Sequence, residues 1–152
     1  IDQLLREIKP TPRTNIARQL QDIALMMKRR SIVVLISDLL SDVDEVQAGL
    51  DRLRFAGHNV VVLHTLDPYE LEFPFQGAWC FEGLEGEEPL TTQAERIRED
   101  YLTSFNEYMK TLREGCVATH VDYATINTSL PLDGVLSEFF FKRQAMLDGA
   151  RS

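Results

Sequence analysis

The feature that most constrains the fold of this chain is an uninterrupted apolar run at residues 32–36, which stops at Ser37 and Asp38. A run without polar alternation is typical of a strand that is buried on both faces, as strands of parallel sheets are. Ligands of open parallel sheets bind just past the carboxyl ends of the strands. Because Asp38, Asp42 and Asp44 follow the run, this stretch predicts both a fold class and a candidate site.

Hydrophobic periodicity predicts an alternation of helices and strands along the rest of the chain. Helices are expected at 16–27, 42–55, 92–114 and 131–147, strands at 30–36, 59–66 and 121–126, and helix-ending glycines at Gly57 and Gly115. Such alternation implies parallel strands with helices on both faces, which is a Rossmann-like α/β fold. The predicted organisation is one partial domain over 1–152, with an excursion at 68–91 that contains a short hairpin around 78–81 and 87–90.

Three strands make a thin sheet, and this raises a question about the strand at 32–36. An apolar strand at an open sheet edge invites pairing with another chain. One interpretation is that a second molecule covers this edge, so that the edge drives self-association. The interpretation that we favour is that an upstream part of a longer protein covers it, and the start of the chain at Ile1 rather than Met fits that expectation.

Charge and composition exclude some classes of protein. The chain has 152 residues, a formal net charge of −8 and a pI near 4.9, which disfavours a general nucleic-acid binder because such proteins need a basic face. No run of about 18 apolar residues predicts a membrane span. No secretory signal is recognisable at the start of the chain, and Cys80 and Cys116 lack metal-ligand spacing. We therefore expect two free thiols and a cytoplasmic location.

Four segments of the chain match a known family. They are TPRTNIARQLQDIA, RRSIVVLISDLLSD, LDRLRFAGHNVVVLHTLDPYELEFPF and THVDYATINTSLPLDGVLSEFFFKR. Together they resemble the C-terminal half of the bacterial domain-of-unknown-function fifty-eight family. Members of that family look like von Willebrand factor A domains and often accompany MoxR-type AAA+ ATPases. The resemblance implies a protein partner, and it makes such an ATPase a candidate partner.

The resemblance also implies a metal-ion-dependent adhesion site. Thr14 matches the threonine of that site, and Asp38 matches its final aspartate. The Asp-x-Ser-x-Ser segment that completes the site occurs nowhere in this chain. The implied site is therefore incomplete as given: Mg²⁺ is expected in an intact parent, and no cofactor is expected in this chain alone.

Each candidate residue also has a plain structural interpretation. Asp38 and Thr14 are either metal ligands or caps of the helices that follow them. We expect Asp42 and Asp44 to be acidic residues in the first turn of a helix rather than metal ligands. We expect Asp67 to be a turn residue before Pro68. His64 is expected to be a packed or hydrogen-bonded core residue. The aromatic residues of the excursion are either a lid over the sheet end or an exposed docking surface; they are Phe73, Phe75, Trp79 and Phe81.

Two functions follow from these residues, together with a plainer alternative. The absence of a Ser-His-Asp set, of a Gly-rich phosphate loop and of paired cysteine ligands weighs against an enzyme. The leading hypothesis is therefore a non-catalytic protein-interaction module of von Willebrand factor A type. The alternative is a Mg²⁺-dependent phosphotransfer or phosphohydrolase domain that uses Asp38 and Asp67 as clustered carboxylates, although no Lys or Arg directly follows these strands to clamp a phosphate. A third interpretation is that this half serves only as scaffold.

Overall fold

The computed structural model describes residues 16–82 and 88–149. Its helices are α2 (Ile16–Met26), α3 (Val43–Phe55), α4 (Pro68–Glu72), α5 (Ala94–Ala118) and α6 (Leu132–Gly149). Its strands are β1 (Ile32–Ser37), β2 (Asn59–Leu66), β3 (Ala78–Phe81), β4 (Leu90–Gln93) and β5 (Asp122–Asn127). The order of elements agrees with the predicted alternation, and α4 is an additional short helix.

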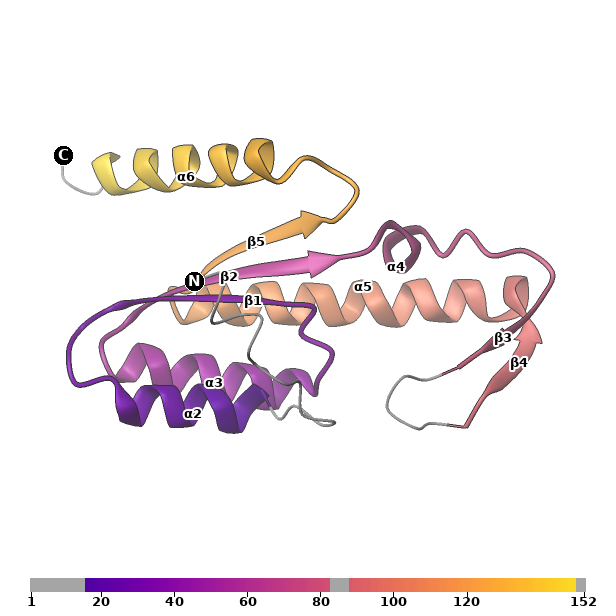
Figure 1. The fold of residues 1–152 in the computed structure, drawn as a ribbon, viewed down its shortest axis with the longest axis horizontal. Helices are drawn as coiled ribbons and strands as arrows, with labels where there is room; N and C mark the ends of the chain where they lie inside the picture. Colours follow the sequence, from indigo (N-terminus) through magenta and orange to yellow (C-terminus); the bar gives the residue numbers. More distant parts are fainter. Residues whose placement is uncertain (1–15, 83–87, 150–152) are drawn as a thin grey trace, which may run out of the picture.

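The three long strands form one parallel sheet in the order β1-β2-β5. Helices α2, α3 and α5 cover one face of this sheet, and α6 lies on the other (Figure 1). Leu50, Val62 and Leu112 are representative of the larger core, and Leu63 and Ile126 belong to the smaller core under α6. The predicted α/β class with helices on both faces of a parallel sheet is therefore confirmed.

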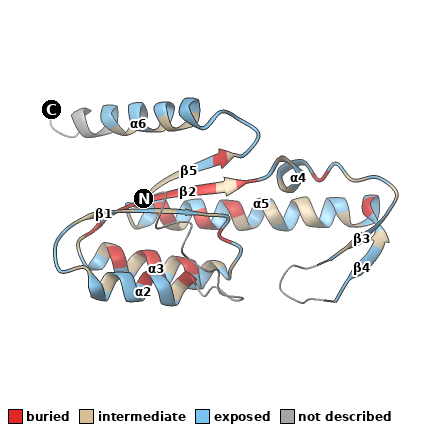
Figure 2. Ribbon diagram, in the orientation of Figure 1, coloured by how far each residue is buried: buried red, intermediate tan, exposed pale blue. Residues whose placement is uncertain are grey.

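The prediction that the first strand is buried on both faces is wrong for the described residues. β1 lies at a sheet edge, and its outward side chains Ile32, Val34 and Ile36 are 60%, 52% and 65% exposed (Figure 2). Val33 and Leu35, on the other face, pack against the larger core. The reason is that the small core under α6 is built from β2 and β5 and does not reach β1. The central strand is β2, which is buried along most of its length.

A structural arm projects past the carboxyl ends of the parallel strands (Figure 1). It consists of α4, the β3-β4 hairpin and the N-terminal end of α5, and it corresponds to the predicted excursion. The hairpin is present, but its second strand is Leu90–Gln93 rather than the predicted 87–90, and α5 begins at Ala94 rather than at 92. Trp79 lies opposite Thr92 in its antiparallel register. Asp67 is the N-cap of α4: its side chain accepts a hydrogen bond from the Tyr69 backbone, and the Glu70 side chain accepts one from the Asp67 backbone.

The prediction that Gly115 ends its helix is also wrong, because α5 continues to Ala118. Gly115 instead marks a close contact between α5 and α3. A Cβ atom at this position would lie 2.2 Å from Oε1 of Gln47, and the Gln47 side chain donates to the Gly115 carbonyl oxygen. Gly57, by contrast, follows α3 with φ of +86°, a left-handed conformation that glycine adopts without strain, as expected for a helix-ending residue.

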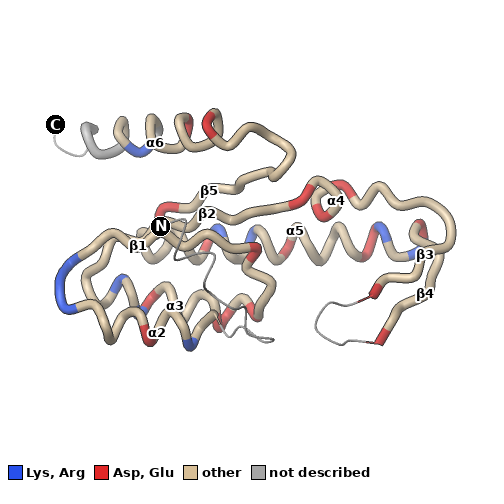
Figure 3. Tube along the Cα trace, in the orientation of Figure 1, with Lys and Arg blue, Asp and Glu red and all other residues tan. Residues whose placement is uncertain are grey.

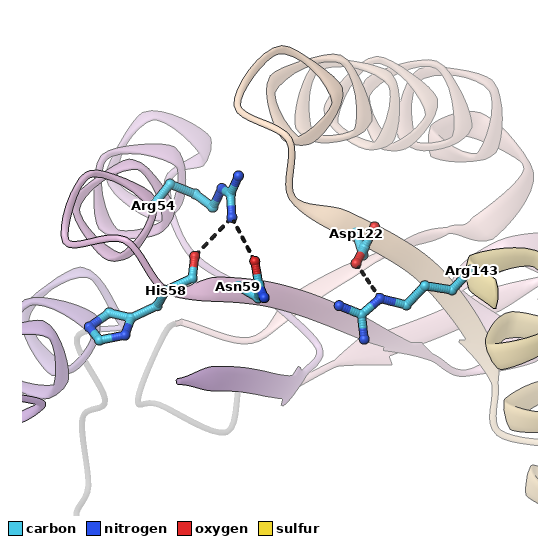
Figure 4. Close-up of polar contacts among 5 residues, drawn as sticks. All are labelled: Arg54, His58, Asn59, Asp122 and Arg143. Atoms are coloured by element: carbon cyan, nitrogen blue, oxygen red, sulfur yellow. Dashed lines mark hydrogen bonds and ion pairs between the residues drawn. The ribbon is translucent and has the colours of Figure 1, made fainter. Parts of the chain in front are cut away.

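Two arginines fasten the helices to the amino ends of the strands (Figure 4). The Arg54 guanidinium donates to the His58 carbonyl oxygen at 2.8 Å and contacts Asn59 Oδ1 at 3.4 Å, which ties the end of α3 to the start of β2. Arg143 Nε lies 2.7 Å from Asp122 Oδ2, and this ion pair joins α6 to β5. Helix α6 is therefore held to the sheet by charge as well as by its apolar contacts.

Two further sequence predictions can be compared with the described residues. Cys80 is exposed, Cys116 is buried, and both are free, as predicted. Across 16–82 and 88–149, no helix combines the length and the apolar character that crossing a membrane requires.

Candidate functional site

Asp38 lies at the carboxyl edge of the parallel sheet, directly after β1, and its side chain is exposed. Its Oδ1 accepts hydrogen bonds from the Leu40 backbone at 3.3 Å and from the Ser37 hydroxyl at 3.4 Å. The Ser37 hydroxyl oxygen in turn accepts one from the Leu39 backbone at 3.1 Å. These short-range bonds fold residues 37–41, here called the Asp38 loop, into a tight turn.

Leu39 anchors the Asp38 loop in the core. Its side chain is fully buried, and its backbone has φ of +53°, which is uncommon for a residue with a side chain. Its carbonyl oxygen accepts a hydrogen bond from the Tyr108 hydroxyl on α5. Burial of Tyr108 raises the pKa of its phenol, so this hydroxyl keeps its proton and remains a donor at neutral pH.

His64, in the central strand, forms a hydrogen bond with the backbone of Asp38 in the same loop. Its Nε2 lies 2.8 Å from the Asp38 carbonyl oxygen, and its Nδ1 lies 2.7 Å from the Tyr123 hydroxyl. A carbonyl oxygen only accepts, so Nε2 carries the proton and Nδ1 accepts from Tyr123. Burial lowers the pKa of His64, although the bond to Asp38 opposes this shift, and the imidazole is neutral near pH 7. The prediction that His64 is a hydrogen-bonded core residue is confirmed.

Two hollows border the Asp38 loop. One, of about 220 Å³, lies between this loop, β2, α4 and α5, and its polar lining includes Asp38, Ser41, His64 and Glu70. The other, of about 390 Å³, lies between this loop, β1 and α2, and Ile16 lines it at the start of α2. Asp38 is thus shared by both hollows and presents its carboxylate at the sheet edge.

The oxygen atoms around Asp38 are of the type that binds a hard cation, but the described residues provide few of them. Mg²⁺ prefers carboxylate, hydroxyl and water oxygens, and the Asp38 loop offers one carboxylate and the hydroxyls of Ser37 and Ser41. Among the residues that the structure describes, no three His, Cys, Asp or Glu side chains cluster closely enough to hold a metal ion.

The remaining described residues that were predicted as site candidates lie at helix starts. Asp42 is the N-cap of α3, where its Oδ1 accepts from the Asp44 and Glu45 backbones at 2.9 and 3.3 Å, and Asp44 is a first-turn acid as predicted. Asp67 caps α4 and does not line the hollow that contains Asp38. Thr14 lies outside the described residues.

Sequence reasoning missed the partners that shape this edge. Glu70 shares a hollow with Asp38. Tyr108 donates a hydrogen bond to the loop, and Tyr123 acts on it through His64. The spacing from Asp67 to Glu70 carries the signal of a capping box, which indicates a helix start but not proximity to Asp38. The two tyrosines gave no signal, because Tyr108 lies 69 residues from the loop residue that it contacts.

The fold and this site define a mixed α/β protein with a three-stranded parallel sheet, compatible with a Rossmann-like architecture, and with polar residues gathered at the carboxyl ends of the strands. The family model described as "Protein of unknown function DUF58" matches residues 1–111 of the chain. The chain therefore belongs to the DUF58 family, as its sequence segments indicated. Searches of curated proteins and of solved structures gave no match.

Proposed function

We propose that the chain is a non-catalytic protein-interaction module of von Willebrand factor A type, with Asp38 at the centre of its partner-binding edge. The observation that carries this proposal is the Asp38 loop itself. Its backbone is fixed by His64 and Tyr108, while its carboxylate remains exposed between two hollows. A rigid, exposed carboxylate at a strand end suits recognition by a partner, because little conformational entropy is lost on binding.

The make-up of the same edge supports a role without catalysis. The hollow shared by Asp38 and Glu70 is lined by no Lys or Arg, so its described lining offers no cationic group to stabilise a transferring phosphoryl group. Both nitrogens of His64 are engaged within the fold, which leaves neither for proton transfer to a ligand. These features favour binding over chemistry.

Metal dependence is the finer part of the proposal. In a polypeptide that also carries an Asp-x-Ser-x-Ser segment, Asp38 and Thr14 would add ligands to a Mg²⁺ ion. Among the described residues no strand pairs with the outer edge of β1, and a further strand carrying such a segment would pair there. The start of α2, two residues after Thr14, lines the same hollow as Asp38, which fits this arrangement.

Calorimetric titration of Mg²⁺ into such a longer polypeptide tests the metal part. We expect Asp38→Ala to weaken Mg²⁺ binding by about tenfold or more, because a charged ligand is lost. The matched control is Asp44→Ala, which removes an equally exposed carboxylate from the adjacent helix turn and leaves the affinity unchanged. Equal Mg²⁺ affinity of the Asp38→Ala variant and the unmodified protein would refute metal binding at this site.

A MoxR-type AAA+ ATPase is the proposed partner, and this assignment rests on the family resemblance alone. Surface plasmon resonance between the two purified proteins, with Mg²⁺ and then with EDTA, tests it. Binding that requires both Mg²⁺ and Asp38 is the expected result. If the unmodified protein in EDTA and the Asp38→Ala variant in Mg²⁺ both bind the ATPase as tightly as the unmodified protein does in Mg²⁺, the contact lies elsewhere.

A second candidate is a Mg²⁺-dependent phosphotransfer or phosphohydrolase domain. It is favoured by one observation, which is that Asp38 shares a hollow with a second carboxylate, that of Glu70. This activity predicts hydrolysis of a generic phosphoester such as p-nitrophenyl phosphate in the presence of Mg²⁺. Turnover that disappears in both Asp38→Asn and Glu70→Gln would support the enzyme and count against the non-catalytic module.

A further inference from the structure

Three aromatic rings form a strip along the arm, here called the aromatic strip, which is exposed at both ends and half-buried in the middle. Tyr69, Phe75 and Trp79 follow one another with ring centroids 5.5 and 4.9 Å apart. Tyr69 is 58% exposed and Trp79 is 44% exposed, so both ends of the strip face solvent. Exposed aromatic rings that adjoin one another are typical of surfaces that bind another protein.

Contacts with a buried ring and with the backbone fix the orientation of the strip. Phe73 is 5% exposed, and its ring packs against Phe75 at 5.0 Å and against Tyr101 of α5 at 4.7 Å. The Trp79 indole N–H donates to the Gln76 carbonyl oxygen at 2.9 Å, which fixes the orientation of that ring. Because these rings are already ordered, a ligand that binds them pays little further entropy.

The arm that carries the strip is strongly acidic. Residues 68–82 and 88–101 contain seven Asp or Glu and two Arg, a formal charge of −5 out of the −8 of the whole chain. Figure 3 marks Asp or Glu positions on α4, at the ends of the hairpin and at the start of α5. One of the two arginines, Arg98, is used inside the arm, where it donates to the carbonyl oxygens of Phe73 and Glu72. The surface around the rings is thus dominated by negative charge.

We propose that this aromatic strip binds a basic, arginine-containing segment of a partner protein. Guanidinium groups stack on aromatic faces, and surrounding carboxylates attract them electrostatically. An apolar segment would satisfy only the contact with the rings, and an acidic segment would satisfy neither property. The inference deepens the proposed function, on which it rests: Glu70 of α4 lines the Asp38 hollow next to Tyr69, so one partner can contact both surfaces.

The chain contains one tryptophan, and that tryptophan is Trp79. Its fluorescence therefore reports directly on the strip. The experiment titrates the 152-residue chain, in EDTA, with an eight-residue peptide that alternates Arg and Ala. A matching peptide with Glu in place of Arg, and one with Lys, serve as comparisons. We expect a saturable change in Trp79 emission with the Arg peptide, a weaker one with Lys and none with Glu.

Two sets of variants separate the strip from general attraction by an acidic protein. Tyr69→Ala removes one ring and is expected to weaken binding of the Arg peptide about fivefold, within the range of one cation–π contact. The double variant Glu72→Lys with Glu82→Lys reverses two charges on the arm, and we expect it to weaken binding of the Arg peptide about tenfold or more at low salt. The matched control, Asp22→Lys with Glu107→Lys, makes the same change of charge away from the arm and should weaken it less than twofold. Circular dichroism verifies that each variant is folded.

Three results would overturn the inference. They are equal binding of the Glu peptide, equal loss of affinity in the control pair and in the arm pair, and an unchanged affinity in the Tyr69→Ala variant. Because the titration is carried out in EDTA, Mg²⁺-dependent binding at the Asp38 edge does not contribute to it. The strip and the Asp38 edge can therefore fail independently, because each has its own variant and its own ligand.

Discussion

His64 connects an exposed residue of the site, Asp38, to the most buried strand of the sheet. It contacts the Asp38 carbonyl oxygen on one side and the Tyr123 hydroxyl on the other, while its own side chain is 1% exposed. The periodicity of β2 was enough to predict that this histidine is internal. It did not reveal that His64 positions Asp38, since that depends on which loop lies beside β2 in space.

This arrangement makes stability depend on pH. The folded-state pKa of His64 is lowered below 6.5 by burial, so below that pH the unfolded chain binds a proton that the folded chain resists. Stability from this residue is thus fully present above about pH 6.5 and is lost as pH falls through the folded-state pKa. In urea unfolding, the free energy of unfolding should be about 1 kcal/mol lower at pH 5.5 than at pH 7.5. The difference between the two pH values should be smaller in the His64→Gln variant.

The control for this measurement is His120→Asn. His120 is exposed and has φ of +57°, a conformation that asparagine tolerates. This variant should retain the pH dependence of the unmodified chain. If His64→Gln and the unmodified chain lose equal stability between the two pH values, the assigned role of His64 is incorrect.

Helix α2 approaches α3 closely at a glycine, and large apolar side chains of both helices pack in the same core. A Cβ atom at Gly49 would lie 2.8 Å from Leu20 Cδ1 and 3.1 Å from its Cβ. Single-sequence periodicity places both helices correctly but cannot show such an approach, for the same reason that Gly115 was expected to end α5. Glycine inside a helix is costly by itself, so its presence at both positions reflects a close tertiary contact.

Two alanine substitutions test this at the level of elements. Gly49→Ala should lower the free energy of unfolding by about 1–3 kcal/mol, because the added methyl group forces the two helices apart. Gly134→Ala in α6 meets no atom within 4 Å and should instead raise it by up to about 1 kcal/mol through helix propensity. Thermal and urea unfolding measure both, and an equal effect of the two substitutions would contradict the packing described for α2 and α3.

The whole molecule combines a well-covered face with an incomplete one. Strand order could not be read from the first strand, because the apolar run at 32–36 indicates a buried strand but not which neighbours bury it. The described residues leave its outer edge and the side chains of Ile32, Val34 and Ile36 open. The alternation, the parallel sheet and the strand-end position of Asp38 were predictable, and the small number of strands already raised the possibility that the strand at 32–36 lies at an edge. Which of its side chains stay exposed depends on long-range pairing and could not be predicted.

This open face predicts self-association of the 152-residue chain. Sedimentation equilibrium should detect concentration-dependent dimers, and Val34→Lys should weaken them, because a charge in the middle of an edge strand opposes pairing. Val117→Lys is the matched control, since Val117 is 71% exposed on α5, away from this edge. Monomers at every concentration, or equal weakening by both variants, would show that β1 does not drive self-association in this chain.

The central claim is that a partner protein docks at the carboxyl edge around Asp38. The most direct test places a photo-crosslinking amino acid at Leu40, which is 73% exposed beside Asp38, and compares it with the same group at Phe55, which is 92% exposed at the end of α3. We predict a crosslinked partner from position 40, lost when Asp38→Ala is added, and none from position 55. A crosslink from position 40 whose yield is unaffected by Asp38→Ala, or a crosslink from position 55 alone, would contradict the claim.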